Sequence, residues 1–395
     1  MNNSPQNILI DARAIQSGYK QHKNRGIGYY AQNLISELIN MDIEYTLTFL
    51  EEQGLPVDPL VSGKSFILHK PLISRMPKII EAQWSLPINI PRKSFEMVHF
   101  LSHEDASFLS PCPYVVSVMD AITLAVRDLY KPWQRLKYQA VYYIAKRIIK
   151  NAEMVIAISE HTKKDIMKYY GIPSENICVV PLAAEQRFFQ EWLSNDVINL
   201  RARYELPETF ILYVGGIDPR KNLVILFKAM KALLESGSYC PTLAFAGRIS
   251  NQREYPEMMK TIRSLGIEHL IKFLGYVPDE DLPLLFQASR AFVYPSRYEG
   301  FGLPVLQAMA SGTPVLTTKL SSIPEVAGNA AVYINPDDPA LLAQAINAIL
   351  TNKEMRSSLI ASGKKQAAMF SWKRTADETV EVYREVIKKI HYTHS

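Results

Sequence analysis

The strongest constraint on the fold is the regular alternation of short apolar runs with segments long enough to form helices. Strands separated by such crossover segments are typical of parallel sheets. The runs form two series, so we predict an α/β protein with two Rossmann-like, doubly wound domains. The first series comprises 7–11, 45–50, 65–69, 97–100, 114–118, 154–158 and 177–180, and the second comprises 210–214, 243–246, 271–274, 291–294, 315–317 and 331–334.

The length of the chain and the gap between the two series indicate where the domains end. A chain of 395 residues suggests two or three domains. We place the boundary within 181–207, and predict domains at 1–190 and 205–370. The tail, 371–395, is predicted to be a helix, because apolar side chains recur along it with helical periodicity. These are Ala376, Val380, Tyr383 and Ile387.

The composition is that of an ordinary globular protein. Hydrophobic residues make up 48% of the chain and charged residues 21%, and the formal net charge is +5. This mild basicity is compatible with anionic substrates, and we expect no nucleic-acid partner. Cys112, Cys178 and Cys240 lack metal-ligand spacing and are predicted to be free thiols. No signal-like start or apolar run of about 18 residues is present, so we expect a cytoplasmic protein.

The segment 294–314 combines a strand end, a carboxylate, two glycines and a helix. Glu299 precedes Gly300 and Gly302, and a helix is expected at 303–310. A helix N-terminus presents free N–H groups and partial positive charge, which suits a diphosphate, and glycine permits close approach to the backbone. Glu299 could then accept hydrogen bonds from sugar hydroxyls. The alternative is a plain strand–loop–helix unit whose glycines serve turns.

A second loop with a similar character follows the expected strand 210–214. Gly215 and Gly216 allow a tight turn, and Arg220 and Lys221 then precede the next helix. Cations are unfavourable near a helix N-terminus, so their presence indicates a bound anion. The alternative is a solvated loop.

These two segments resemble the donor site of retaining glycosyltransferase family 4, also known as glycosyl transferases group 1. The family motif is Glu, seven residues, Glu; here the first is Glu299, whereas the second position is Gln307. The resemblance covers nearly the whole chain. It implies the GT-B fold, in which two Rossmann-like domains face a cleft and a C-terminal helix crosses back to the first domain.

The resemblance also implies an activity. It is the metal-independent, retaining transfer of a hexosyl group, mannosyl among the candidates, from a GDP-, UDP- or dTDP-sugar, without a cofactor. The acceptor would be a hydroxyl of a glycan or lipid-linked molecule in cell-surface polysaccharide or glycoconjugate synthesis. A sugar-nucleotide epimerase, a phosphorylase and a non-catalytic sugar-nucleotide-binding subunit stay open as alternatives. Turnover without acceptor would indicate the epimerase, and binding without turnover the subunit.

The resemblance assigns roles to individual residues. Lys221 matches the family's phosphate-binding lysine; the arginine that often follows the first glycine is Gly216 here, and Arg220 is its candidate replacement. The segment 321–325 resembles a recurring Ser-Xaa-Xaa-Pro-Glu element, whose Pro324 and Glu325 we interpret as structural. The expected catalytic residues are Glu299, Lys221, Arg220 and Asp120; the expected donor-binding residues are Gly26, Gly28, Gly215, Gly216, Gly275, Tyr276, Val277, Gly300, Phe301, Gly302, Leu303 and Gln307.

Residues that follow the expected strands of the first domain are further candidates for the functional site. Gly26 and Gly28 enter a helix expected at 31–39, but they lie too far beyond the first strand for a nicotinamide-binding turn. Asp120 is either a helix cap or a catalytic residue. His103 is either an acceptor contact or a loop histidine, and His99 is predicted to pack within its strand.

Two further segments have competing interpretations. The acids at 279–281 look like the Asp-Xaa-Asp metal motif of another glycosyltransferase class, but they open a predicted helix, so we interpret them as its cap and expect no metal site. The segment 131–150 is basic, lacks acids and carries an apolar stripe. It is either an interfacial helix on the inner membrane face, bound to anionic lipid, or a core-packed helix with a solvated basic face.

Overall fold

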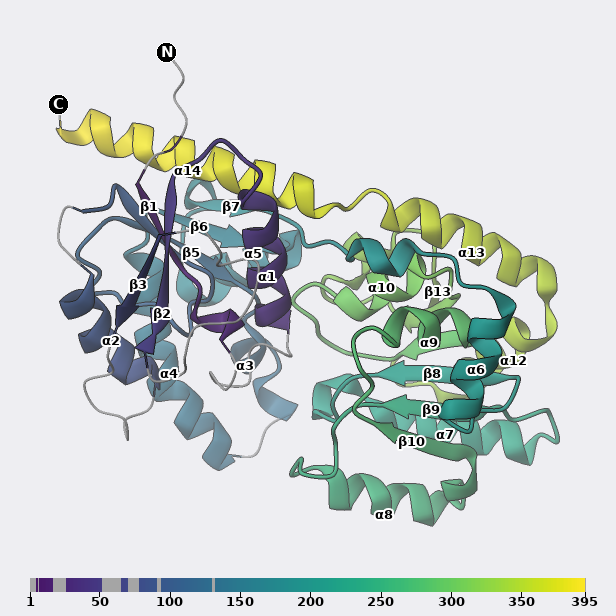
Figure 1. Cartoon of the computed structure of the whole chain (residues 1–395). Helices are drawn as coiled ribbons and strands as arrows, with labels where there is room; N and C mark the ends of the chain where they lie inside the picture. Colours follow the sequence, from purple (N-terminus) through teal and green to yellow (C-terminus); the bar gives the residue numbers. More distant parts are fainter. Residues whose placement is uncertain are drawn as a thin grey trace. The chain divides into compact units, whose positions relative to one another are not determined.

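The computed structural model describes residues 5, 7–16, 26–51, 65–69, 78–90, 94–129 and 132–394. The chain divides into two compact units, Met1–Leu182 together with Trp372–Ser395, and Ala183–Ser371. Each unit is a parallel sheet with helices packed on it (Figure 1). Every expected strand is present, with bounds within one residue of the prediction.

The first unit is built on a seven-stranded parallel sheet. Helices cover its faces, so its central strands β1, β4 and β5 are buried along their whole length rather than at alternate residues. Its strand order is β3 (Phe66–His69), β2 (Tyr45–Leu50), β1 (Ile8–Asp11), β4 (Met97–Phe100), β5 (Tyr114–Val118), β6 (Met154–Ala157) and β7 (Ile177–Val179).

The helices of the first unit are α1 (Gly26–Leu38), α2 (Lys78–Asn89), α3 (Ile122–Ala125), α4 (Pro132–Lys150), α5 (Glu160–Asp165) with its continuation η6 (Ile166–Tyr170), and α14 (Trp372–His394). One expectation is wrong: α1 begins at Gly26, so Gly26 and Gly28 form its first turn instead of a loop before it. Their predicted backbone contacts would therefore come from a helix N-terminus.

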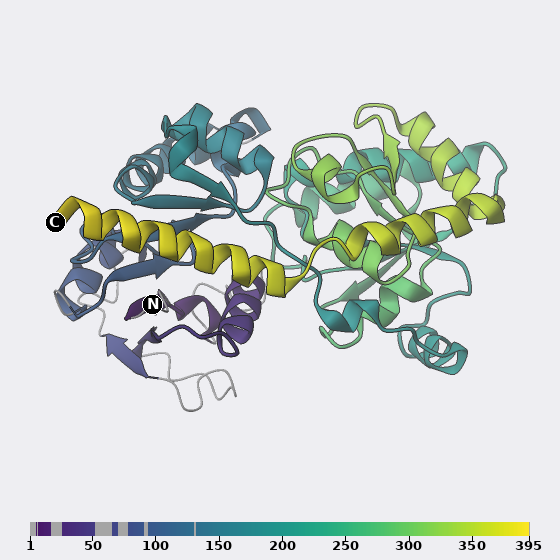
Figure 2. The ribbon, with the colours of Figure 1, turned by 90° about the horizontal axis from the view of Figure 1, so that it is seen from above.

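The C-terminal helix α14 packs on the first unit, along which it runs in Figure 2. Thr375 Oγ1 donates a hydrogen bond to the carbonyl of Pro181 (2.7 Å). The Tyr383 hydroxyl contacts His99 Nδ1 (2.7 Å), and His99 Nε2 contacts Ser117 Oγ (2.9 Å). His99 is thus a packed strand residue, as predicted, and burial lowers its pKa to about 3.

The second unit repeats the architecture with a six-stranded parallel sheet, in the order β10 (Ile271–Gly275), β9 (Thr242–Ala246), β8 (Phe210–Val214), β11 (Ala291–Tyr294), β12 (Val315–Thr318) and β13 (Val332–Ile334). Its helices are α6 (Ser194–Arg203), α7 (Leu223–Glu235), α8 (Tyr255–Leu265), α9 (Leu282–Ala288), α10 (Leu303–Ala310), α11 (Ile323–Ala327), α12 (Pro339–Thr351) and α13 (Lys353–Ala367). Helix α6 lies inside the stretch that we expected to be the domain boundary.

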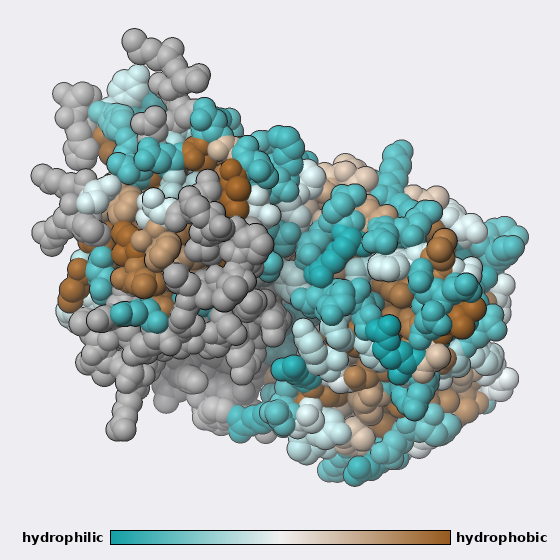
Figure 3. Space-filling model, viewed as in Figure 1, coloured by the Kyte–Doolittle hydropathy of each residue, from teal (hydrophilic) through white to brown (hydrophobic). Residues whose placement is uncertain are grey.

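One face of the second unit mixes polar and apolar residues. Figure 3 shows hydrophilic residues over much of this face, with apolar residues between them. Within the described ranges, no helix combines the length and the apolar character that a membrane span needs.

Candidate active site

The candidate site lies where two loops of the second unit meet. Strands β8 and β11 are neighbours, and the strand order runs outward from this pair in opposite directions. Ligands of open α/β sheets bind beyond the carboxyl ends of strands at such a switch point. The loop after β8 carries Arg220 and Lys221, and the loop after β11 carries Glu299. A hydrogen bond from the Arg297 N–H to the Arg220 carbonyl (2.7 Å) joins the loops.

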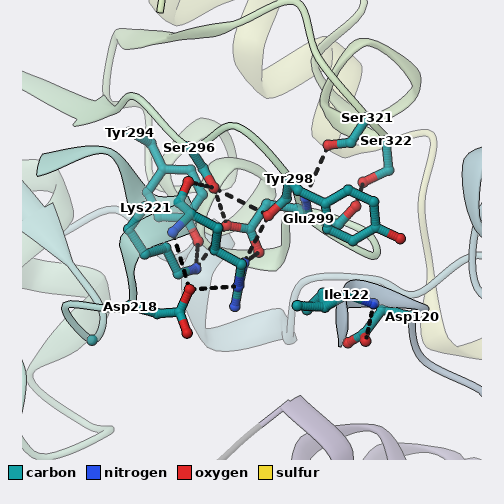
Figure 4. A network of polar contacts seen from close by, with 12 residues as sticks. Asp120, Ile122, Asp218, Lys221, Tyr294, Ser296, Tyr298, Glu299, Ser321 and Ser322 are labelled. Carbon is teal, nitrogen blue, oxygen red and sulfur yellow. Dashed lines mark hydrogen bonds and ion pairs between the residues drawn. The ribbon is translucent and has the colours of Figure 1, made fainter. Parts of the chain in front are cut away.

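Glu299 is held between the two cations (Figure 4). Lys221 Nζ donates to Glu299 Oε1 at 2.7 Å, and Arg220 Nη1 lies 2.8 Å from Glu299 Oε2. Arg220 Nη1 also donates to the Tyr298 carbonyl (2.7 Å), which fixes its direction. The structure therefore brings together three of the four expected catalytic residues.

Two residues that the sequence analysis missed complete this cluster. Lys221 Nζ donates to the Tyr294 hydroxyl and lies 4.7 Å from the centre of the Tyr294 ring. Ser296 Oγ donates to Glu299 Oε1 (2.6 Å). Their positions in the sequence could have identified them as site residues. Tyr294 ends β11, and Ser296 lies three residues before Glu299 in the same loop.

The backbone of Glu299 is fixed by the serines of the segment 321–325. Ser321 Oγ accepts the Glu299 N–H (2.9 Å), and Ser322 Oγ donates to the Glu299 carbonyl (2.9 Å). Ser321 adopts a positive φ of 53°, which is uncommon for a residue other than glycine. Ser321 and Ser322 thus position the candidate carboxylate, a role that the sequence analysis did not predict for this segment. The interpretation of Pro324 and Glu325 as structural residues stays a prediction.

Burial and charge together set the protonation of the cluster. Burial alone would raise the pKa of Glu299, but the charges of Lys221 and Arg220 and the hydrogen bonds from Lys221 and Ser296 lower it to about 2. Burial lowers the pKa of Lys221 to about 8, against the opposing pull of Glu299. Burial also acts to lower the pKa of Arg220, but the Glu299 carboxylate raises it overall. At neutral pH the cluster holds one carboxylate and two cations.

The start of α10 lies directly after this carboxylate. Gly302 has a φ of 105°, and a Cβ there would come within 2.9 Å of Ile323 Cδ1, so only glycine fits. Gly302, the residue before the helix, has no side chain that could cap it. Phe301 is buried and packs edge-on against Phe370, with ring centroids 5.9 Å apart. Gly300 and Gly302 thus belong to the loop, Leu303 is the first residue of α10, and Phe301 anchors the loop in the core.

The other expected donor-binding residues lie on neighbouring loops of the same unit. Gly215 and Gly216 follow β8, and the Tyr213 hydroxyl donates to the Gly216 carbonyl (2.6 Å). Gly275 ends β10 with a φ of 68°. Tyr276 is 43% exposed, and the Arg248 guanidinium lies 4.4 Å from its ring centre. Val277, the third residue of this loop, is buried.

Gln307 occupies the second position of the motif, on α10. Its side chain is 7% exposed. A contact between Gln307 and the donor stays a prediction.

In the first unit, Asp120 acts as a local cap. Its Oδ1 accepts the N–H of Ile122, the first residue of α3, at 3.0 Å (Figure 4). The His103 N–H donates to the Ser117 carbonyl (3.1 Å). A catalytic role for Asp120 and an acceptor contact for His103 stay predictions.

The acids at 279–281 do not cap α9 as predicted. The Asp281 side chain forms no capping bond and instead accepts two hydrogen bonds from Arg203 (both 2.8 Å) and one from the Tyr204 hydroxyl (2.7 Å). It pairs with the C-terminal end of α6, because Arg203 and the next residue, Tyr204, offer donors that outcompete the N–H groups of α9. No cluster of three potential metal ligands occurs among the residues that the structure describes.

Of the α4 side chains that the structure describes, several apolar ones lie against the core, whereas Tyr143 is 60% exposed. Ile148 is fully buried and Ile144 packs against the same core. Lys146 lies 5.6 Å from the Tyr142 ring centre, and Arg147 lies 5.3 Å from that of Phe108. These contacts favour the core-packed interpretation of this segment.

Two family models and several relatives match this chain. Residues 24–185 match the family model described as Glycosyltransferase Family 4, and residues 198–366 match the model described as Glycosyl transferases group 1. The O-antigen chain mannosyltransferase B of Escherichia coli is 28% identical over 377 residues, which cover 91% of this chain and 96% of that protein. The serotype-specific mannosyltransferase WbdA of Escherichia coli is 25% identical; the alignment covers 98% of this chain but only 49% of that longer protein.

A solved structure shows the same fold. Anabaena Alr3699/HepE, crystallised in complex with UDP and glucose, superimposes with a TM-score of 0.72 at 18% identity, over 96% of this chain and 99% of that one. Two parallel-sheet units thus coincide with family matches over both halves of the chain. The chain belongs to the family 4 glycosyltransferases, glycosyl transferases group 1, and has their GT-B fold.

Proposed function

We propose that the protein transfers a hexosyl group from a nucleotide-diphosphate sugar to a hydroxyl of a glycan or lipid-linked acceptor, with retention of anomeric configuration. The observation that carries this proposal is the buried cluster of Glu299, Lys221 and Arg220 at the switch point of the second sheet. Two cations beside a helix N-terminus form a site for a diphosphate leaving group.

In this mechanism Lys221 and Arg220 stabilise the charge that develops on the leaving diphosphate. Groups held in place before the reaction supply such stabilisation without reorganisation. Glu299 is a poor candidate nucleophile, because two cations hold its carboxylate and keep its pKa near 2. Its role would be to orient the two cations and the donor sugar. Retention would then follow from attack of the acceptor on the face that the diphosphate leaves.

The donor and the process are proposed from the relatives. The mannosyltransferases named above favour a mannosyl donor and a role in O-antigen-like polysaccharide synthesis. The UDP and glucose bound to Alr3699/HepE keep UDP-sugars among the candidates. GDP-, UDP- and dTDP-sugars are therefore the set to test.

The test is a thermal-shift screen of GDP-, UDP- and dTDP-sugars, followed by a transfer assay with the stabilising donor and candidate oligosaccharides. We expect one donor to raise the melting temperature and to yield a product with the donor's anomeric configuration. Donor consumption without any acceptor would indicate an epimerase instead. Binding without turnover for every acceptor would indicate a non-catalytic subunit, the alternative that Gln307 and Gly216 support.

We also propose that catalysis needs no metal, since cations and backbone N–H groups already face the expected diphosphate. Transfer should persist in excess EDTA. Loss of activity in EDTA with recovery on addition of Mg²⁺ or Mn²⁺ would contradict this. A cytoplasmic location with peripheral contact through 131–150 stays a prediction, which the inward packing of α4 weakens.

A further inference from the structure

The first unit contains a hollow that the proposed donor site does not use. It has a volume of about 210 Å³ and lies between α3, the short helix η5 (Arg127–Leu129), α4 and η6. Its lining includes Thr123, Arg127, Gln139, Tyr142, Tyr143 and Tyr169. Three tyrosines thus surround a space in which hydrogen-bonding side chains are also present.

The tyrosines give this hollow an aromatic wall that is partly open to solvent. The rings of Tyr142 and Tyr143 lie 5.4 Å apart and are tilted by 59°. Tyr143 is 60% exposed. Covering an exposed aromatic ring with apolar surface lowers the free energy. The exposed ring of Tyr143 therefore offers a face for a ligand.

Hydrogen bonds and ring stacking fix the position of Tyr142 in this aromatic wall. The Tyr142 hydroxyl donates to the Tyr169 carbonyl (3.0 Å), and Lys146 Nζ donates to the same hydroxyl (3.3 Å). The Tyr142 ring stacks on buried Tyr170, with centroids 5.7 Å apart. Tyr169 and Tyr170 belong to a π-helical turn, a feature frequent at functional sites. The aromatic surface is therefore formed before any ligand arrives.

The chemistry of the wall and rim matches a sugar ring. A pyranose has an apolar C–H face that stacks on aromatic rings and a rim of hydroxyls that need donors and acceptors. Thr123, Arg127 and Gln139, all exposed, supply both kinds of group. The volume is below the roughly 300–1,000 Å³ of a typical small-molecule site, which fits one ring rather than a whole nucleotide sugar.

The hollow lies close to the carboxyl end of β5. Helix α3, which contributes Thr123, begins two residues after Asp120 and is capped by it. Burial raises the pKa of Tyr170, behind the wall, and the nearby Asp120 carboxylate raises it further. The hollow is thus adjacent to Asp120, which the sequence analysis predicts to be catalytic.

We propose that this hollow is a glycan subsite, which binds one sugar ring of an oligosaccharide acceptor by stacking on Tyr143 and hydrogen bonding to Arg127 and Gln139. This inference rests on the proposed function, since it assigns the acceptor class to a glycan rather than a small alcohol. Occupancy of the subsite would make longer acceptors bind more tightly than a monosaccharide.

The experiment is saturation-transfer NMR on the full chain with three probes, methyl α-mannoside, mannotriose and inorganic phosphate. Wild type should show ring-proton transfer from mannotriose. Tyr143→Ala should weaken mannotriose binding about three- to tenfold, whereas Tyr143→Phe, which keeps the ring, should bind like wild type. Tyr239→Ala is the matched control, because Tyr239 is 59% exposed and belongs to the second unit.

The outcomes separate the subsite from the proposed activity. Equal mannotriose binding by wild type and Tyr143→Ala overturns the subsite, even if the enzyme transfers sugar. Loss of binding in Tyr143→Ala without transfer by wild type supports the subsite and overturns the proposed function. Phosphate binding that Arg127→Ala abolishes, with no response to mannotriose, would replace the glycan with an anion and overturn the proposal.

Discussion

The two units bury their charges at the same place in the sheet but in different ways. Strands β1 and β8 occupy equivalent positions, each beside the point where strand order reverses. At the end of β1, Arg13 forms two 2.7 Å hydrogen bonds with Asp11, and the side chains are 1% and 2% exposed. Beyond β8, Lys221 and Arg220 share Glu299, and side-chain exposure is 10% and 16% for the cations.

This difference separates a structural ion pair from a candidate binding site. Asp11 and Arg13 neutralise each other one to one, and Arg13 also donates to the Asp105 carbonyl, so the pair has no need of a ligand. Glu299 and Asp218, which is 38% exposed and lies 3.6 Å from Arg220, together match the two cations in formal charge. The two clusters therefore differ in exposure rather than in charge balance: the Arg220 and Lys221 side chains are 16% and 10% exposed, so a ligand can reach them, whereas that of Arg13 is 1% exposed.

The largest effect should come from breaking the structural pair. Arg13→Met leaves the buried Asp11 carboxylate without its partner and should lower the free energy of unfolding by about 3–5 kcal/mol. Urea denaturation followed by circular dichroism measures this. Asp11→Leu combined with Arg13→Met is the control, because replacing both charges should restore most of the loss. A single variant as stable as wild type would refute the structural role.

Lys221→Ala should act on activity rather than on the fold. Losing one group that stabilises the leaving diphosphate should cost on the order of 10² to 10³ in kcat, with an unchanged circular dichroism spectrum. Lys231→Ala is the control, since Lys231 lies on α7 and pairs with Glu235. Glu299→Ala should also lower activity. Wild-type turnover by Lys221→Ala would remove Lys221 from the mechanism.

The pH dependence of kcat/KM sharpens the same assignment. The pKa of Lys221 is lowered to about 8, and the charged form binds the diphosphate. Rising pH removes that proton, so kcat/KM should fall above pH 8, approaching tenfold per pH unit. In Lys221→Arg the guanidinium stays charged, and this alkaline decline should disappear. An identical decline in both proteins would assign it to another group.

The smallest effect concerns Gln307. A neutral amide lacks the charge that strengthens hydrogen bonds to ribose hydroxyls, so ribose binding should be weaker than with Glu by roughly 1 kcal/mol. The site should then discriminate little between UDP and dTDP. Gln307→Glu should shift a competition assay toward UDP. Strong preference for UDP in wild type, with the same ratio in the variant, would show that Gln307 has no part in sugar selection.

The strands and the positions of the loops after β8 and β11 could be predicted because their signals are local. Apolar runs define the strands, and Lys221 and Gly302 follow strand ends closely in the sequence. The partners of Glu299 could not all be found in this way, because Ser321 and Ser322 reach it from the loop after β12 through tertiary contacts.

Competition between partners explains the errors. Asp281 looked like a helix cap, but Arg203 and Tyr204, at the C-terminal end of a helix distant in sequence, bind it instead. The start of α1 was placed too late because glycines favour loops by propensity. The aromatic hollow could not be predicted from the sequence, because Tyr142 and Tyr169 come together only when α4 and η6 pack.

The most direct test of the central claim, that the cluster of Lys221, Arg220 and Glu299 binds the donor diphosphate, is calorimetric titration with a nucleoside diphosphate and its monophosphate. The base is the one that the thermal-shift screen selects. Wild type should prefer the diphosphate by at least about tenfold, and Lys221→Ala should lose most of that preference, because a charged hydrogen bond to the second phosphate is worth roughly 1.5–3 kcal/mol. A preference that is the same in both proteins would contradict the account.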